Sequence, residues 1–338
     1  MNNIDNILKE VKTVQTKTGY WLVRTMGGDY YKEYTSNEYI AIGFNEISIA
    51  DIKQANTYGK KASAQLKLML EAKRLADKQL NKKKDPGYAA NQMLNFYNKI
   101  NVGDLIVIPG KNSDYVAIAR VESDVYEEQN IPKLPDYCQF KKRRRIKVLK
   151  KLYRSKLNPK MLQMFGSHHI ISDISAYAEY IDSSVSDFYS KDDVTYLVLR
   201  VKEEDNLRAL DFGVMPGLIQ LLDEFVEENQ ISDIDVNDIK GKICVQSPGD
   251  ILMFATSPGG LMLIGLFIYF LTGGKIELNK ENGLKMEGGN IFKAVGEFLD
   301  GRRERKFMKT LTKSLKNMKI ETPDDFTKIM EEFNKRKD

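Results

Sequence analysis

Hydrophobic and polar positions follow two different periods in the first half of the chain. Short apolar runs at 20–24, 39–44, 105–109, 115–121 and 143–149 are separated by Gly, Pro and Asn, which predicts strands joined by tight turns. Residues 63–80 and 93–100 instead repeat apolar side chains every three or four positions, which predicts two amphipathic helices. The first half is therefore predicted to be a small mixed α+β domain.

The second half predicts an α/β segment followed by helices. Its expected elements are a strand at 194–201, a helix at 215–230, a strand running into a turn at 243–249, and amphipathic helices carrying the apolar stripes 291–299 and 307–318. Thr322 followed by Pro323 is typical of the start of one more helix, with Thr as the N-cap.

One segment carries no charge at all, although 29% of the chain is Asp, Glu, Lys or Arg. Residues 251–274 are long enough to cross a bilayer, since about 20 predominantly apolar residues span its hydrocarbon. Only 261–271 is continuously apolar apart from Gly265, and such a shorter run is also typical of a buried core helix. Glycines weaken a soluble helix by about 0.5–1 kcal/mol each but help membrane helices to pack closely.

We therefore expect a transmembrane or pore segment at 250–275, with a buried core helix as the alternative. The residues expected to face lipid or to line a pore are Phe254, Leu261, Ile264, Gly265, Phe267, Ile268, Phe270 and Leu271.

Charge is distributed unevenly along the chain, whose net charge is +5. Residues 136–160 contain eleven Lys or Arg against one Asp, which favours nucleic acid or another polyanion as a partner. Residues 223–238 contain seven acids and no base, an acidic run typical of a solvated face. The region 276–338 is basic and amphipathic, which suits either an anionic membrane surface or packing on the rest of the protein.

Several classes of active site are excluded by the residues present. Two cysteines exclude a disulfide scaffold and a Cys-rich zinc site, and the first ten residues lack the apolar run of a secretory signal peptide. No Gly-rich phosphate loop and no Ser/His/Asp order is present. We expect no catalytic residues, no metal, no cofactor and no enzymatic activity.

The apolar runs of the first half also occur in a specific order of motifs. These are Trp21-Leu-Val-Arg24, Gly27-Gly28, Ile40-Ala-Ile-Gly-Phe44, Val102-Gly-Asp-Leu-Ile-Val-Ile-Pro109, Ala117-Ile-Ala-Arg-Val121 and Arg144-Arg-Ile-Lys-Val148. This order resembles the PUA-like/EVE-like module at the N-terminus of Mrr-type restriction proteins, and the run from Ser167 to Tyr177 is similar to its helical end. The resemblance covers 18–185 and implies a small, open β-barrel that binds a base or a modified nucleotide. Phe44 departs from the pattern, because Trp often occupies that position.

The resemblance implies a binding surface in which aromatic rings stack on bases, at about 1–3 kcal/mol per base, and cations neutralise phosphates. The expected ligand-binding residues are Trp21, Arg24, Tyr30, Tyr31, Tyr39, Phe44, Arg120, Lys142, Arg143, Arg144, Arg145 and His168. Trp21, Tyr39 and Phe44 also fit core positions, and His168 also fits a structural role. Mrr-type catalysis would need acidic residues and a Lys around 194–201, but Asp192, Asp193, Lys202 and Glu203 lack the usual spacing.

These observations predict a sensing domain at 1–185, an α/β connection at 186–249, the membrane segment at 250–275 and the helical region at 276–338. The arrangement is similar to membrane effectors of bacterial anti-phage systems of the Hailong type. It implies a homo-oligomeric antiviral pore in the inner membrane, with a cytoplasmic N-terminal domain that binds a nucleotide or single-stranded oligonucleotide supplied by a signal-producing partner enzyme. The alternative is a soluble, cytoplasmic, modification-dependent DNA-binding protein of restriction type.

Overall fold

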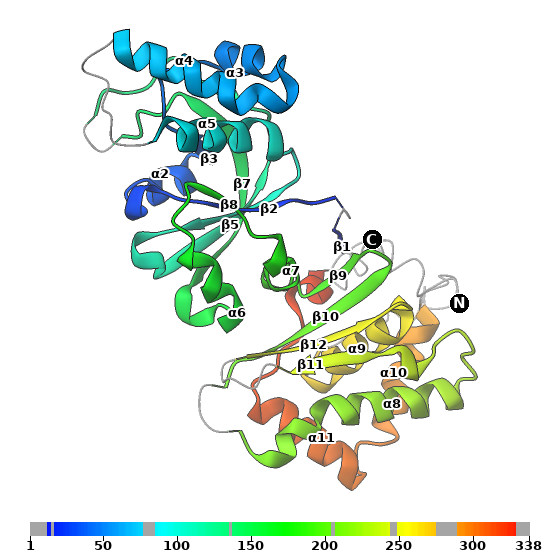
Figure 1. Ribbon diagram of the computed structural model, residues 1–338. Coiled ribbons are helices and arrows are strands. Elements are labelled where there is room, and N and C mark those ends of the chain that lie inside the picture. The colour runs from blue at the N-terminus through cyan, green and yellow to red at the C-terminus, as the bar shows by residue number, and fades with distance from the viewer. Residues whose placement is uncertain are drawn as a thin grey trace. The chain divides into compact units, whose positions relative to one another are not determined.

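Two compact units make up the part of the chain that the computed structural model describes, namely residues 12–14, 17–76, 85–134, 137–203, 207–243, 249–274 and 289–328. We call residues 17–185 the N-terminal unit. The C-terminal unit combines the described residues of 1–16 with those of 186–338. Figure 1 labels the elements of both units.

The N-terminal unit is built on a curled, mostly antiparallel sheet. Its strands are β2 (Tyr20–Val23), β3 (Tyr39–Ile42), β4 (Leu105–Pro109), β5 (Tyr115–Val121), β6 (Tyr126–Glu127), β7 (Lys142–Tyr153) and β8 (Ile171–Asp173). The order is β3-β7-β5-β4-β2-β8, with β6 beside β7, and only β2 and β4 run parallel. A register shift between Ile118 and Ala119 bends the long pair β5–β7, as a bulge does. The sheet thus forms a half-barrel, where a small barrel was predicted.

Helices pack on both faces of this sheet because its strands alternate their side chains between two cores. The helices are α2 (Tyr31–Ser36), α3 (Ile49–Asn56), α4 (Ala62–Ala76), α5 (Pro86–Leu94), α6 (Pro159–Leu162) and α7 (Ala178–Val185). Along β2, Trp21 and Val23 join the core beneath α3, α4 and α5, whereas Tyr20 and Leu22 join the core beneath α6 and α7. Ser48 and Asp51 form a capping box that fixes where α3 begins.

The C-terminal unit is a five-stranded sheet with helices packed on one face (Figure 1). Its strands are β1 (Lys12–Thr13), β9 (Phe188–Lys191), β10 (Val194–Val201), β11 (Lys240–Ile243) and β12 (Gly249–Ala255), in the order β1-β9-β10-β12-β11. Only β1 and β9 are parallel. The helices are α8 (Val214–Glu228), α9 (Pro258–Leu271), α10 (Gly289–Asp300) and α11 (Lys306–Asn317), with a further helical turn at 324–328.

The predicted transmembrane segment, and with it the prediction of a membrane channel, is wrong. Among the described residues no helix combines the length and the apolar character needed to span a bilayer, and α9 has only 14 residues. The uncharged run is divided into two elements: 251–255 belong to β12, and α9 begins at Pro258. A helix that is apolar on all sides is buried either in a membrane or in the core of a protein, and α9 is buried in the core of this unit.

The predicted pore residues belong to this structural core or to its edge. Leu261, Ile264, Gly265, Phe267 and Ile268 are buried in α9. Phe270 and Leu271 are half-buried and pack on the same core, whereas Phe254 lies on the opposite face of the sheet beside Tyr196.

The three regions predicted after residue 185 belong to one unit and share its larger core. Side chains of β10, β12, α8, α9, α10 and α11 share a single hydrophobic cluster. Two residues of the acidic run are paired within this unit, since Arg302 bonds to Glu224 and Glu228 and Arg305 bonds to Glu224. Part of the basic C-terminal region therefore neutralises these two glutamates of the same chain.

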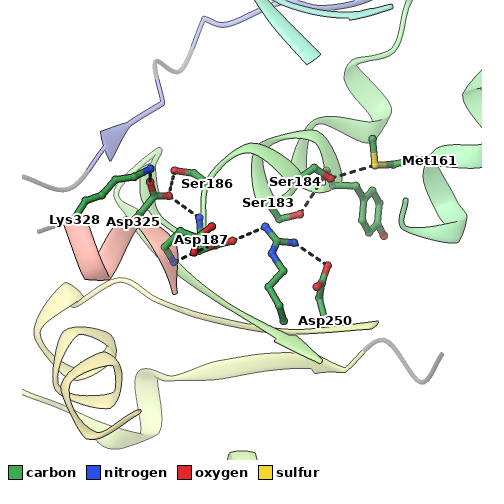
Figure 2. A network of polar contacts seen from close by, with 11 residues as sticks. Met161, Ser183, Ser184, Ser186, Asp187, Asp250, Asp325 and Lys328 are labelled. Atoms are coloured by element: carbon green, nitrogen blue, oxygen red, sulfur yellow. Dashed lines mark hydrogen bonds and ion pairs between the residues drawn. The ribbon is translucent and has the colours of Figure 1, made fainter. Parts of the chain in front are cut away.

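A polar network attaches the last helical turn to the start of β9 (Figure 2). The Asp325 carboxylate accepts hydrogen bonds from the Ser186 hydroxyl and from the Asp187 amide. Arg200 reaches the carboxylates of both Asp187 and Asp250. Burial alone would lower the pKa of Arg200, but the two carboxylates raise it above its ordinary value.

Gly265 allows close packing between α9 and the last helical turn. A Cβ atom at this position would lie 2.7 Å from the ring of Phe326, whereas one at Gly296 of α10 would meet nothing within 4 Å. We expect Gly265→Ala to lower the free energy of unfolding by about 1 kcal/mol, because overpacking outweighs the helical preference of Ala. Gly296→Ala should raise it by about 0.5–1 kcal/mol.

Urea denaturation followed by far-ultraviolet circular dichroism measures both changes. Trp21, the only tryptophan, lies in the N-terminal unit, so its fluorescence transition should stay in place as an internal control. Equal stabilisation by both variants would contradict the packing of Phe326 on α9.

Candidate functional site

A cavity of about 740 Å³ opens in the N-terminal unit, within the range of about 300–1,000 Å³ that is typical of small-molecule sites. Its wall comes from the turn after β2, the end of β3, the turn between β4 and β5, both flanks of β7, and the segment from α6 to β8. The lining residues are Arg24, Met26, Gly27, Ala41, Gly43, Phe44, Asn112, Ser113, Phe140, Arg154, Leu162, Phe165, Gly166, His168 and Ile170.

The backbone around this cavity is strained. Met26, Phe44, Asn112 and Ser113 have φ angles of 53°, 62°, 52° and 58°, in the left-handed region that non-glycine residues rarely adopt. Nine non-glycine residues among those described have such angles, and four of the nine line this one cavity. Such strain costs about 1–3 kcal/mol per residue and gathers at binding sites, where the surroundings hold it in place.

Two glycines let the walls of the cavity approach each other. A Cβ atom at Gly28, whose φ is +112°, would lie 2.4 Å from the backbone of Lys111, so the turn after β2 touches the turn between β4 and β5. The Thr25 hydroxyl ties the same two segments by donating to the carbonyl of Pro109. A Cβ at Gly43 would lie 3.1 Å from the ring of Phe140.

Three phenylalanine rings, those of Phe44, Phe140 and Phe165, contribute to the wall. Phe140 packs edge-on against Tyr30 at 5.4 Å between ring centroids, and Tyr30 stacks on the buried Tyr34 at 6.0 Å. The ring of Phe140 is therefore supported from behind, and it presents an apolar surface to the cavity at little conformational cost.

The charged residues that line the cavity are cations. Arg24 donates from Nη2 to the carbonyls of Phe165 and Ser167, which ties the segment after α6 to β2, and burial lowers its pKa. Arg154 is exposed, and its guanidinium lies 5.7 Å from the centre of the Phe165 ring. Among the described residues that form the wall there is no carboxylate, so the cavity has a positive field with aromatic walls.

Of the residues predicted to bind a ligand, Arg24, Phe44 and His168 line the cavity. Tyr30 lies one layer behind it, against Phe140. Trp21, Tyr31 and Tyr39 are core residues: the Trp21 indole donates to Asp104, Tyr31 packs on Tyr115, and the Tyr39 hydroxyl donates to Glu33.

Most of the predicted basic surface is turned inward. Lys142, Arg143 and Arg144 are at most 4% exposed, and all three donate to backbone carbonyls. Arg120 and Arg145 are exposed but do not line the cavity. The sequence indicated cations in a strand, but it could not show which of them would meet carbonyl groups instead of solvent.

Sequence reasoning missed Phe140, Arg154, Phe165 and the turn at Lys111–Ser113. The glycine pair Gly27-Gly28 is visible in the sequence as a motif, but the segment that it contacts, at Lys111, lies far along the chain. Among the described residues no group of three or more His, Cys, Asp or Glu could hold a metal ion. Asp192 and Asp193, considered for nuclease chemistry, occupy the two-residue turn between β9 and β10, where both adopt positive φ.

The strain at Met26 can be released without disturbing the core, because its side chain is 54% exposed. We expect Met26→Gly to raise the free energy of unfolding of the N-terminal unit by about 1 kcal/mol, since glycine adopts positive φ freely. Met26→Ala keeps the backbone penalty and should give no such gain. Urea denaturation followed by Trp21 fluorescence measures both, and an equal effect of the two variants would show that the left-handed backbone stores no strain.

The comparisons with known proteins are limited to one region. A family model for a domain of unknown function, DUF8426, matches residues 21–167, less than half of the chain. The matched region contains every residue that lines the cavity except His168 and Ile170. No curated protein matches the chain, and no solved structure matches it.

Proposed function

We propose that the N-terminal unit binds the base of a nucleotide, either free or within a single-stranded oligonucleotide, in this cavity. The observation that carries the proposal is the combination of three phenylalanine rings and two arginines in one cavity whose described wall has no carboxylate. Flat apolar walls suit a planar ring, and cations at the rim suit the phosphate attached to it.

Each part of the wall supplies one component of nucleotide binding. Stacking of a base on an aromatic ring contributes about 1–3 kcal/mol. Arg154, exposed beside Phe165, is free to turn its guanidinium toward a phosphate, and arginine binds phosphate through two parallel hydrogen bonds. Asn112 and Ser113 carry side chains that both donate and accept hydrogen bonds, as reading the edge of a base requires.

The resemblance to PUA-like/EVE-like modules supports the same function, because it implies a module that binds a base or a modified nucleotide. A base held in a cavity must be unstacked, so a single strand or a base flipped out of a duplex is favoured over a paired one. Modification-dependent DNA binding of the restriction type is the more specific form of this proposal.

The test is fluorescence anisotropy with a fluorescein-labelled oligonucleotide of about eight deoxyadenylates, a length within the range of about 4–16 nucleotides that single-strand binding modules occupy. We expect Arg154→Met to weaken binding about tenfold or more and to reduce the dependence of affinity on salt, because one phosphate contact is lost. Arg120→Met removes the same charge from an exposed site outside the cavity and should change the affinity less than twofold.

Two outcomes would overturn the proposal. One is the absence of binding by the unmodified chain to this strand and to the nucleoside monophosphates at low salt. The other is an equal loss of affinity in the two arginine variants, which would place the nucleic acid on a diffuse basic surface.

A further inference from the structure

The side chain of Lys142 lies beneath the turn that carries Phe44 into the cavity. It is 1% exposed, and its Nζ atom donates to the carbonyl oxygens of Phe44 and Ile47, each at 2.8 Å. The amide of Ile47 also donates to the carbonyl of Phe44, at 3.0 Å, which closes the four-residue turn 44–47. The ammonium group therefore forms a hydrogen bond with the first and the last residue of this turn.

This turn needs external support because Phe44 has a φ of 62°, a conformation that a bulky side chain does not adopt by preference. A second tie comes from Asn45, whose side chain donates to the carbonyl of Gln139 and accepts from the amide of Lys141. Asn45 fixes the turn to the chain before β7, whereas Lys142 fixes the carbonyl of the strained residue itself.

The charged groups around Lys142 come from α3, α4, β6, the turn 44–47 and the residue before β7. The carboxylates of Glu46, Asp51 and Glu127 attract its ammonium, and the neighbouring Lys141 repels it. From α4, Arg74 pairs with Glu46 at 3.0 Å and Lys73 pairs with Asp51. Glu127 also accepts a hydrogen bond from the amide of Ile49 at the start of α3.

Burial outweighs these carboxylates and lowers the pKa of Lys142 to about 8. The ammonium is thus present at neutral pH and is lost as the pH rises through that value. Hydrogen bonds from a charged donor are roughly twice as strong as those from a neutral one, so the two carbonyl contacts weaken when the proton leaves. The attraction to the three carboxylates is lost at the same time.

We propose that Lys142 is a positioning residue of the cavity: its ammonium holds the turn 44–47 in the form that directs Phe44 into the wall, and losing that charge loosens the wall. The consequence for ligand binding rests on the proposed function, whereas the effect on the turn does not.

The turn is tested first, without any ligand. Fluorine NMR of the full chain with 4-fluorophenylalanine at position 44 follows the Phe44 ring between about pH 7 and about pH 9.5. We expect its resonance to shift with a midpoint near pH 8 in the otherwise unmodified chain, where the ammonium is lost. A resonance that stays constant over this range would overturn the proposal, and this measurement depends on no variant of Lys142.

Variants then assign the titration. Lys142→Arg keeps a charge that is not lost below about pH 12, and Lys142→Met has neither donor nor charge, so the titration should vanish in both. Lys141→Met removes the same charge from the adjacent exposed residue and should leave the titration in place. A midpoint near pH 8 that survives in Lys142→Met would assign it to another group and overturn the proposal.

The final measurement is the affinity for the deoxyadenylate strand, whose bases do not titrate in this range. We expect affinity to fall about three- to tenfold between about pH 7 and about pH 9, as the two carbonyl contacts of Lys142 weaken, and to remain constant in Lys142→Arg. If the fluorine resonance titrates but the unmodified chain does not bind the strand, the proposed function fails while the role of Lys142 in the turn stands. If binding is present and independent of pH, the link between the turn and the ligand is wrong.

Discussion

The architecture of the N-terminal unit depends on three buried cations in successive positions of one strand. Lys142, Arg143 and Arg144 of β7 place their charges against backbone carbonyls of four separate segments: 44–47, 138–140, 96–97 and Ser123. A buried charge without a hydrogen-bond partner would be costly. Each of these four segments is therefore held in place by the carbonyl groups that accept hydrogen bonds from the buried cations. One strand therefore fixes four segments that are separate from one another in the sequence.

Two of those segments, 44–47 and 138–140, contribute Phe44 and Phe140 to the wall of the cavity. Met26, Gly27, Phe44, Asn112 and Ser113 of the wall lie in turns with a left-handed backbone, so part of the cavity's shape is set where the chain leaves the sheet. The sheet supplies rigidity, and the turns supply the rings and the cations. Binding proteins in general place their ligand-contacting residues on loops that a rigid scaffold positions, and this cavity follows the same arrangement.

The strands were largely predictable because their apolar runs are short and bounded by turn residues. The burial of the cations was not, because Lys142, Arg143 and Arg144 are consecutive in one strand and all three are buried, whereas the alternation of side chains along a strand predicts that they face opposite sides in turn. The uncharged run 251–274 is not one helix, because Pro258 begins a new element after β12, and Gly265 is explained by Phe326, some 60 residues away in sequence. Contacts of this kind leave no local signal.

The order of the strands in the C-terminal unit gives the N-terminal unit an architectural role. β1 precedes residue 17 and β9 follows residue 185, yet the two strands pair in parallel, Thr13 beside Ser190. Parallel neighbours cannot be joined by a tight turn and need a crossover of a dozen or more residues. The whole N-terminal unit is that crossover. Deleting it would leave the end of β1 and the start of β9 at opposite ends of this parallel pair, so any shortened protein would need a replacement connection long enough to run back along the strands.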